Sequence, residues 1–376
     1  GMWGQDWTIP EPSIEQYNEA NIFDNARNYS DKAVVVIARS GGEGADLPRS
    51  LDPSVEDTFV DGGTFGSKGI RYSDQKDDLD VDKSYLELSN RETAMLDAVN
   101  KKFKNIIVII NASNPMELGF VNEYENITSV LWCPGAGQTG FNALGKILDG
   151  EVNPSGKTSD IFVYDLKTTP SYNNFGDFRY TNMDEFAVED RGVSYNPSFV
   201  NYAEGIYVGY RFYETAAKEG AINYAGYVQY PFGYGLSYTN FTKEMGEIVA
   251  NNGKISIDVL VTNTGNVAGK DVVQLYFNPP YTNGGIEKAS TNLIGFAKTK
   301  LLQPGESETV KITFAVEDMA SFDEKIKKAY VLEKGVYEIS LQEDSHNILD
   351  TRTFPLEDDI VYGDTNKRSS DDAVAT

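Results

Sequence analysis

Cysteine and histidine are almost absent from this 376-residue chain, which contains one of each, Cys133 and His346. One cysteine cannot form an intrachain disulfide, and one Cys with one His cannot supply the ligands of a structural zinc site. A Ser-His-Asp triad would have to use His346, and no G-x-S-x-G motif for its nucleophile is present. We therefore expect no metal and no cofactor, and we interpret His346 as a surface-loop residue and Cys133 as a core residue.

Basic residues are also scarce. The chain has 33 Lys and Arg but 57 Asp and Glu, which gives a net charge of −24. Such a surface repels phosphate backbones and anionic lipids, so we expect neither nucleic acid nor membrane as a partner. No apolar run approaches the ~18 residues of a membrane-spanning helix. The polar N-terminus lacks a signal-peptide pattern and, with the single cysteine, favours a cytoplasmic location. A neutral substrate such as a sugar is compatible with all of these features.

The first half of the chain alternates predicted helices with predicted strands. Capping-box spacings at Ser13 and Ser89 predict helices that run to about Asn28 and about Phe103, and a third helix is expected over residues 141–148. Apolar runs over residues 33–38, 106–110 and 129–132 are typical of strands covered on both faces. This alternation predicts an α/β domain with a mostly parallel sheet, whose active site would lie beyond the carboxyl ends of the strands.

The pattern changes after about residue 241. Short alternating strands are expected over residues 254–259, 272–277, 308–314 and 335–341, with turn residues between them. Their spacing predicts an all-β sandwich of about seven strands. The sequence thus divides into an α/β domain with a connecting segment over residues 1–242, a β-sandwich over 243–356 and a polar tail or linker over 357–376.

Two acidic residues, Glu43 and Asp46, lie in a glycine-flanked loop that follows the first buried strand and Arg39. Glycines allow the backbone to bend sharply and hold a carboxylate in a cleft. A carboxyl desolvated there by a covering domain would have a raised pKa and could donate a proton. A solvated loop, or an Asx turn at Asp46, would explain the same residues without any function. The polar segment over residues 41–82 is too long for a simple connector.

The segment Gly135–Gly140 has the G-x-G-x-x-G form of a dinucleotide fingerprint and lies between a predicted strand and a predicted helix. Pro134 precedes the first glycine, the strand is not the first of its unit, and the expected acidic residue is missing. We favour a tight turn with close helix–sheet packing, and nucleotide binding remains the alternative.

Several blocks resemble glycoside hydrolase family 3, the β-glucosidase and β-xylosidase family. In the first domain the resemblance is carried by Arg39–Asp46, Asn153–Lys157, Glu204–Arg211 and Tyr230–Thr239. In the second, Thr262–Gly265, Gly269–Tyr276 and Leu302–Ser307 are similar to the family's fibronectin type III-like domain. The fold class implied is a partial α/β sandwich, incomplete at its N-terminus, followed by a fibronectin-III or immunoglobulin-like β-sandwich.

The resemblance implies a retaining β-glycosidase, with β-glucosidase favoured, that hydrolyses terminal non-reducing β-D-glucosyl residues of a β-glucoside or oligosaccharide. Glu43 corresponds to the family's general acid/base, and Asp46 and Arg39 are implied to bind substrate. The nucleophile would come from a (β/α)8 barrel that this sequence does not contain, so the chain alone is expected to be inactive. The tail over 357–376 resembles the linker of members in which the barrel follows.

Two departures from the family pattern leave a second function open. Leu47 stands where the family has an arginine after Asp46, and Thr139 stands where it has a glutamate. Both changes favour the alternative that the chain is a non-catalytic carbohydrate-binding or interaction module.

Overall fold

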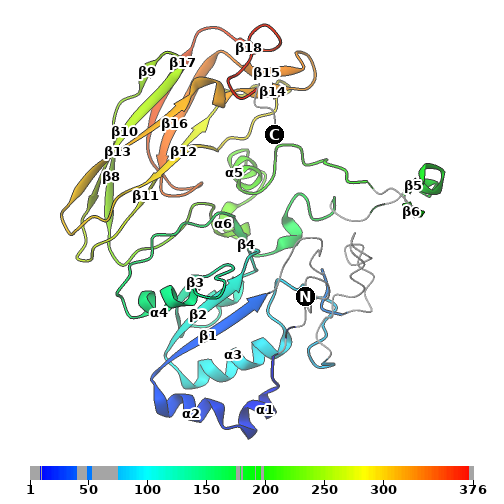
Figure 1. Ribbon diagram of the computed structural model, residues 1–376, viewed down its shortest axis with the longest axis vertical. Coiled ribbons are helices and arrows are strands. Elements are labelled where there is room, and N and C mark those ends of the chain that lie inside the picture. Colours follow the sequence, from blue (N-terminus) through cyan, green and yellow to red (C-terminus); the bar gives the residue numbers. More distant parts are fainter. Residues whose placement is uncertain are drawn as a thin grey trace. The chain divides into compact units, whose positions relative to one another are not determined.

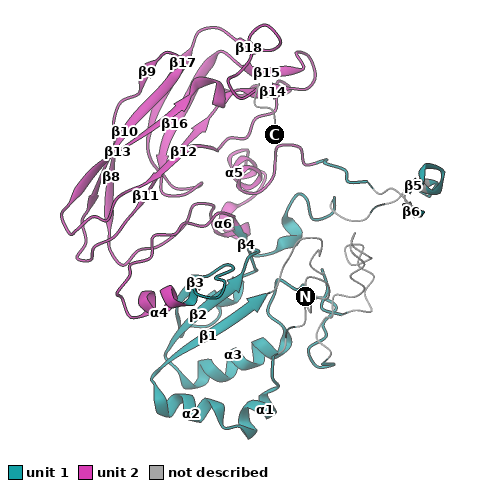
Figure 2. Ribbon diagram, in the orientation of Figure 1, with its two compact units in different colours: residues 1–141, 162–203 teal, residues 142–161, 204–376 magenta. Residues whose placement is uncertain are grey.

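The computed structural model describes residues 9, 11–39, 49–52, 75–174, 178, 181–190, 192–195 and 199–371. They belong to two compact units: unit 1 consists of residues 1–141 and 162–203, and unit 2 consists of residues 142–161 and 204–376 (Figure 2). Unit 2 therefore contains residues on both sides of the predicted boundary at 242/243, and that domain division stays a prediction.

Unit 1 is built on a parallel three-stranded sheet in the order β1-β2-β3 (Figure 1). The strands are β1 (Lys32–Arg39), β2 (Asn105–Ala112) and β3 (Ile127–Trp132). Their registers are parallel, with Val35 beside Val108 and Val108 beside Val130. The predicted strands and the mostly parallel sheet are confirmed, so the carboxyl ends of all three strands lie along one edge.

The burial of β1 differs from the prediction. Val35 and Ile37 are 6% and 1% exposed, whereas Val34 and Val36 are each 52% exposed. A strand that buries alternate side chains has one covered face. The expectation of cover on both faces is therefore wrong for β1, and it is also wrong for β3, in which no residue is fully buried.

The predicted helices form, with one correction. Helix α3 (Asn90–Lys102) begins with the capping box of Ser89 and Glu92, and Figure 1 shows it alongside the sheet. The capping box at Ser13 also forms, but the single helix expected to follow it is two, α1 (Ile14–Glu19) and α2 (Ile22–Tyr29). Asn21 lies between them with a φ of 52°, a left-handed conformation that ends the first helix.

The remaining elements outside the β-sandwich are short. The helices are α4 (Phe141–Leu148), as predicted, α5 (Tyr210–Lys218) and α6 (Tyr224–Tyr227). The strands are β4 (Phe162–Val163), β5 (Val188–Asp190), β6 (Val193–Tyr195) and β7 (Val228–Tyr230). Single 3-10 turns occur at Gly119–Asn122, Leu166–Thr168 and Met183–Phe186, and another, Val316–Met319, lies within the β-sandwich.

Unit 2 contains the predicted β-sandwich. One sheet has the order β13-β10-β8, with β9 paired to β10, and the other has the order β12-β11-β16-β17. A third, small sheet has the order β14-β15-β18. The strands are β8 (Phe241–Met245), β9 (Val249–Asn251), β10 (Lys254–Asn263), β11 (Val272–Asn278), β12 (Asn292–Lys298), β13 (Ser307–Ala315), β14 (Ser321–Asp323), β15 (Ala329–Leu332), β16 (Gly335–Gln342), β17 (Ile348–Leu356) and β18 (Ile360–Tyr362).

The core of the sandwich joins side chains from both large sheets. Ile255, Ile257 and Val259 of β10 and Leu275 of β11 are fully buried in one cluster. Alternate residues of β10 point into this core, which explains the alternating sequence from which the strand was predicted. Within the described part of the chain, no helix combines the length and apolar character needed to cross a bilayer.

Shortening a buried leucine of the sandwich should destabilise unit 2. Leu275 is 0% exposed and Leu260, on the outer face of β10, is 38% exposed. We expect Leu275→Ala to lower the unfolding free energy by about 2–5 kcal/mol, because it leaves a cavity. Leu260→Ala, with the same chemical change, should cost well under 1 kcal/mol. Urea unfolding monitors both, and equal losses would contradict the core assignment.

Candidate active-site edge

Arg39, the last residue of β1, forms a buried ion pair with Glu92. Its side chain is 1% exposed and that of Glu92 is 4% exposed. Nη1 donates to Glu92 Oε1 at 2.8 Å, and Nη2 donates to Oε2 at 2.6 Å. This two-pronged geometry is the strongest form of an arginine–carboxylate pair. It fixes the point at which the chain leaves the sheet.

The other guanidinium donors of Arg39 bind backbone carbonyls. Nε donates to Tyr85 O at 2.6 Å, Nη2 to Glu87 O at 2.6 Å and Nη1 to Ala38 O at 2.8 Å. With the two bonds to Glu92, all five N–H groups have protein acceptors. This arrangement favours a positioning role for Arg39, and the predicted contact with substrate stays a prediction.

Glu92 serves two elements at once. Its Oε2 accepts from Ser89 N at 2.9 Å, and its own N–H donates to Ser89 Oγ at 3.2 Å, which completes the capping box of α3. The same carboxylate pairs with Arg39. The start of α3 and the end of β1 are therefore held together by one side chain.

Glu117, which follows the end of β2, is tied to the same segment. Its N–H donates to Leu86 O at 3.0 Å, and its Oε1 accepts from Leu166 N at 2.7 Å. Burial raises the pKa of Glu117 to about 7, and the nearby carboxylates of Glu87 and Asp165 act in the same direction. Sequence reasoning missed this group, although its place a few residues after a buried strand was a usable signal.

The end of β3 is joined to β2 through its tryptophan. Trp132 Nε1 donates to Ala112 O at 2.7 Å, and its ring makes an edge contact with Phe162 at 5.2 Å between centroids. The carboxyl ends of β2 and β3 are thus joined by a side-chain hydrogen bond, and that of β1 is held by the pair of Arg39 and Glu92.

The segment Gly135–Gly140 forms a tight turn. Gly135 and Gly137 have φ values of 47° and 61°, and Gly140 N donates to Ala136 O at 3.0 Å. A Cβ at position 140 would lie 2.2 Å from Ala136 O, so only glycine fits there. The backbone conformation accounts for all three glycines without a nucleotide.

Glu43 and Asp46 lie outside the described residues, and their predicted roles stay predictions. Cys133 is half-buried rather than fully in the core. Among the residues that the structure describes, no cluster of three or more His, Cys, Asp and Glu side chains could hold a metal ion.

His346 lies in unit 2 and is paired there with a buried carboxylate. Its side chain is 41% exposed, and Nδ1 lies 2.9 Å from Glu214 Oε2. This hydrogen bond raises the pKa of His346, and Tyr224 stacks on the imidazole at 3.6 Å. Ser345 Oγ donates to Oε1 of the same glutamate at 3.0 Å, so the serine and the histidine share a carboxylate and do not form a nucleophile–base pair.

The model of the glycosyl hydrolase family 3 C-terminal domain matches residues 16–210, more than half of the 376-residue chain. The chain belongs to glycosyl hydrolase family 3. A fibronectin type III-like domain model matches residues 271–345, within the sandwich of unit 2. The resemblance found in the sequence and the fold class that it implied are both confirmed.

Relatives of this family 3 chain are β-glucosidases. Beta-glucosidase A of Butyrivibrio fibrisolvens is 35% identical, over 94% of the chain and 40% of its own length. A beta-glucosidase of Ruminococcus albus is 30% identical, over 95% of the chain and 31% of its own length. The chain therefore spans less than half the length of these relatives.

Solved structures agree with this assignment. A beta-glucosidase from Paenibacillus barengoltzii has a TM-score of 0.72 and 29% identity, over 94% of the chain and 33% of its own. Beta-glucosidase 3B from Thermotoga neapolitana, in complex with alpha-D-glucose, has a TM-score of 0.68 and 30% identity, over 91% of the chain and 40% of its own.

Removing the guanidinium of Arg39 should destabilise unit 1. Arg39→Met leaves the Glu92 carboxylate buried without its partner, which typically costs about 3–5 kcal/mol. Arg27→Met is the matched control, because Arg27 is an exposed arginine whose Nη1 donates to Ser30 O. Chemical denaturation followed by circular dichroism measures both variants. Similar stabilities for the two variants would contradict the anchoring role.

The raised pKa of Glu117 predicts that the free energy of unfolding depends on pH. The folded chain keeps this proton to about pH 7, above the ordinary value of 4.5, so stability should fall as the pH rises through that window. Because the group is partly exposed, we expect Glu117→Gln to stabilise the chain by about 1–2 kcal/mol at pH 8 and by little at pH 4. Urea unfolding of the parent and of Glu117→Gln at both pH values measures this difference in unfolding free energy.

The exposed Glu123 provides the control for that experiment. Glu123→Gln should change the unfolding free energy by less than about 0.5 kcal/mol at either pH. A pH-independent effect of Glu117→Gln would show that its carboxyl is not the group responsible.

Proposed function

We propose that the chain supplies the general acid/base of a retaining β-glucosidase, and that this group is Glu43. The supporting observation is the anchored end of β1: the buried Arg39–Glu92 pair fixes the chain four residues before Glu43. Family membership and the β-glucosidase names of the relatives support the substrate class, a terminal β-D-glucosyl residue.

In this mechanism Glu43 protonates the glycosidic oxygen as the bond to the aglycone breaks, and then deprotonates the water that releases the sugar. A carboxylate nucleophile must attack the anomeric carbon from the opposite face. We assign it to a (β/α)8 barrel outside this sequence, so that the chain alone turns over negligible substrate. Asp46 would bind the substrate from the same loop.

The second candidate is a carbohydrate-binding or interaction module without a catalytic part, which Leu47 and Thr139 favour. The two candidates predict different activities when a family 3 barrel is added to the chain. Mixing or fusing the chain with a family 3 barrel should produce hydrolysis of an aryl β-glucoside if the chain completes an active site. Absence of turnover together with retained sugar affinity would favour the module.

Substitution of Glu43 in that reconstituted enzyme tests the acid role. Glu43→Gln should lower kcat/KM for cellobiose by about 10²–10⁴, because proton donation to a poor leaving group is lost. The loss should be much smaller for 2,4-dinitrophenyl β-glucoside, whose leaving group needs no proton. Glu123→Gln should leave both rates unchanged, and equal losses on the two substrates after Glu43→Gln would overturn the assignment.

A further inference from the structure

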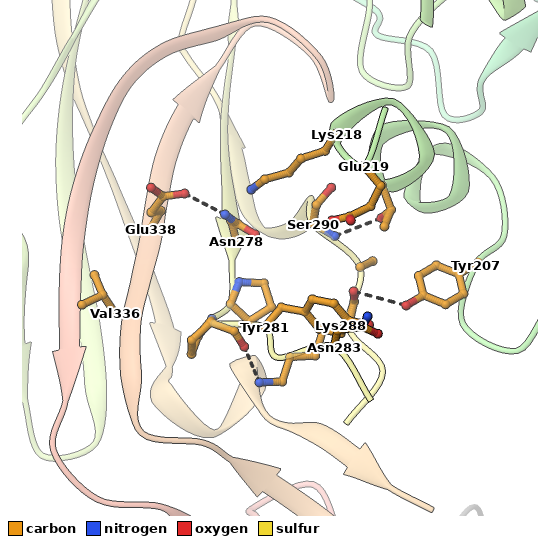
Figure 3. A pocket seen from close by; sticks show the side chains of 14 residues that line it. Tyr207, Lys218, Glu219, Asn278, Tyr281, Asn283, Lys288, Ser290, Val336 and Glu338 are labelled. Carbon is orange, nitrogen blue, oxygen red and sulfur yellow. Dashed lines mark hydrogen bonds between the residues drawn. The ribbon is translucent and has the colours of Figure 1, made fainter. Parts of the chain in front are cut away.

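A cleft of about 580 Å³ lies within unit 2, a size typical of small-molecule sites (Figure 3). Its walls are the end of α5, the loop after β11 and the start of β16. We call it the Tyr281 cleft, and its lining residues used below are Lys218, Glu219, Asn278, Tyr281, Lys288, Ser290 and Glu338.

The cleft offers hydrogen-bonding groups that the protein does not use fully. Asn278 Nδ2 donates to Glu338 Oε2 at 2.7 Å, which leaves Asn278 Oδ1 and Glu338 Oε1 as acceptors (Figure 3). Ser290 Oγ is buried without a hydrogen-bond partner in the described structure. A buried hydroxyl without a partner costs free energy. Rotation of the Ser290 side chain toward the cleft would let a ligand hydroxyl bond to this oxygen, which is otherwise covered, and recover that cost.

The charges of the cleft favour a neutral ligand. The ammonium of Lys288 is neutralised by Glu333 and also donates to Pro280 O. Among the remaining charged residues of the lining, one cation, Lys218, is outnumbered by two carboxylates, those of Glu219 and Glu338. An anionic ligand would be repelled by this excess of negative charge in the cleft and by the overall charge of −24.

An aromatic side chain in the lining supplies apolar contact. Tyr281 is 44% exposed, so its ring is accessible to a ligand. Sugar rings combine an apolar C–H face, which packs on an aromatic ring, with hydroxyls that both donate and accept. The mixture of an accessible tyrosine, unused acceptors and an unsatisfied hydroxyl fits that chemistry.

We propose that the Tyr281 cleft binds a neutral oligosaccharide, with one pyranose ring against Tyr281 and hydroxyls bonded to Asn278, Glu338 and Ser290. This site lies wholly within unit 2 and does not depend on the role of Glu43.

Calorimetric titration of the full chain with cellotetraose tests the proposal. The titration measures binding and not turnover, and Glu43 is not among the described residues that line the cleft, so the binding result is independent of the acid/base proposal. We expect saturable binding at millimolar concentration or below, which Tyr281→Ala weakens about tenfold, as loss of an aromatic contact predicts. Tyr281→Phe should retain affinity, and Ser290→Ala should reduce it.

The control is Tyr202→Ala, since Tyr202 is 77% exposed and does not line the cleft. It should bind as the parent does, and circular dichroism should show all variants folded. Three results would each overturn the proposal: no binding of cellotetraose at millimolar concentration, unchanged affinity in Tyr281→Ala, or tighter binding of the anionic trigalacturonate than of cellotetraose.

Discussion

The buried pair of Arg39 and Glu92 is the interaction on which the arrangement of unit 1 depends. It joins the last residue of β1 to the first turn of α3, and through Tyr85 and Glu87 it holds the segment that also binds Glu117. Removing a paired guanidinium from a site that is about 99% covered would leave a bare carboxylate, which the interior tolerates poorly. The pair therefore fixes where the chain leaves the sheet, and the proposed acid/base follows from that point.

Much of the fold could be predicted from the sequence because the signals were local. The Ser89 capping box, the apolar runs of β2 and β3 and the alternation in β10 each specify an element without reference to the rest of the chain. The break at Asn21 was not predicted, since a left-handed residue between two helical stretches has no reliable pattern. The open face of β1 was missed for a related reason: an apolar run shows what a strand could bury, not what covers it.

The candidate site was less predictable, because its contacts join distant residues. The family resemblance implied Arg39 as a substrate ligand, which stays a prediction. Its observed contacts could not be read from a local pattern, because its five donors bind groups that lie up to 53 residues away in the chain. The raised pKa of Glu117 could not be predicted from its position in the sequence, since it arises from burial and from carboxylates brought near by folding. The cleft in unit 2 likewise combines α5, the loop after β11 and β16, which no single motif could indicate.

A double-mutant cycle on Arg39 and Glu92 tests the central claim most directly. The unfolding free energies of the parent, Arg39→Met, Glu92→Leu and the double variant give the coupling between the two side chains. The account predicts that each single variant loses several kcal/mol and that the double variant recovers at least about 2 kcal/mol of the summed loss, because no unpaired charge remains buried. Additive losses, with a coupling below about 0.5 kcal/mol, would show that the pair does not hold the end of β1.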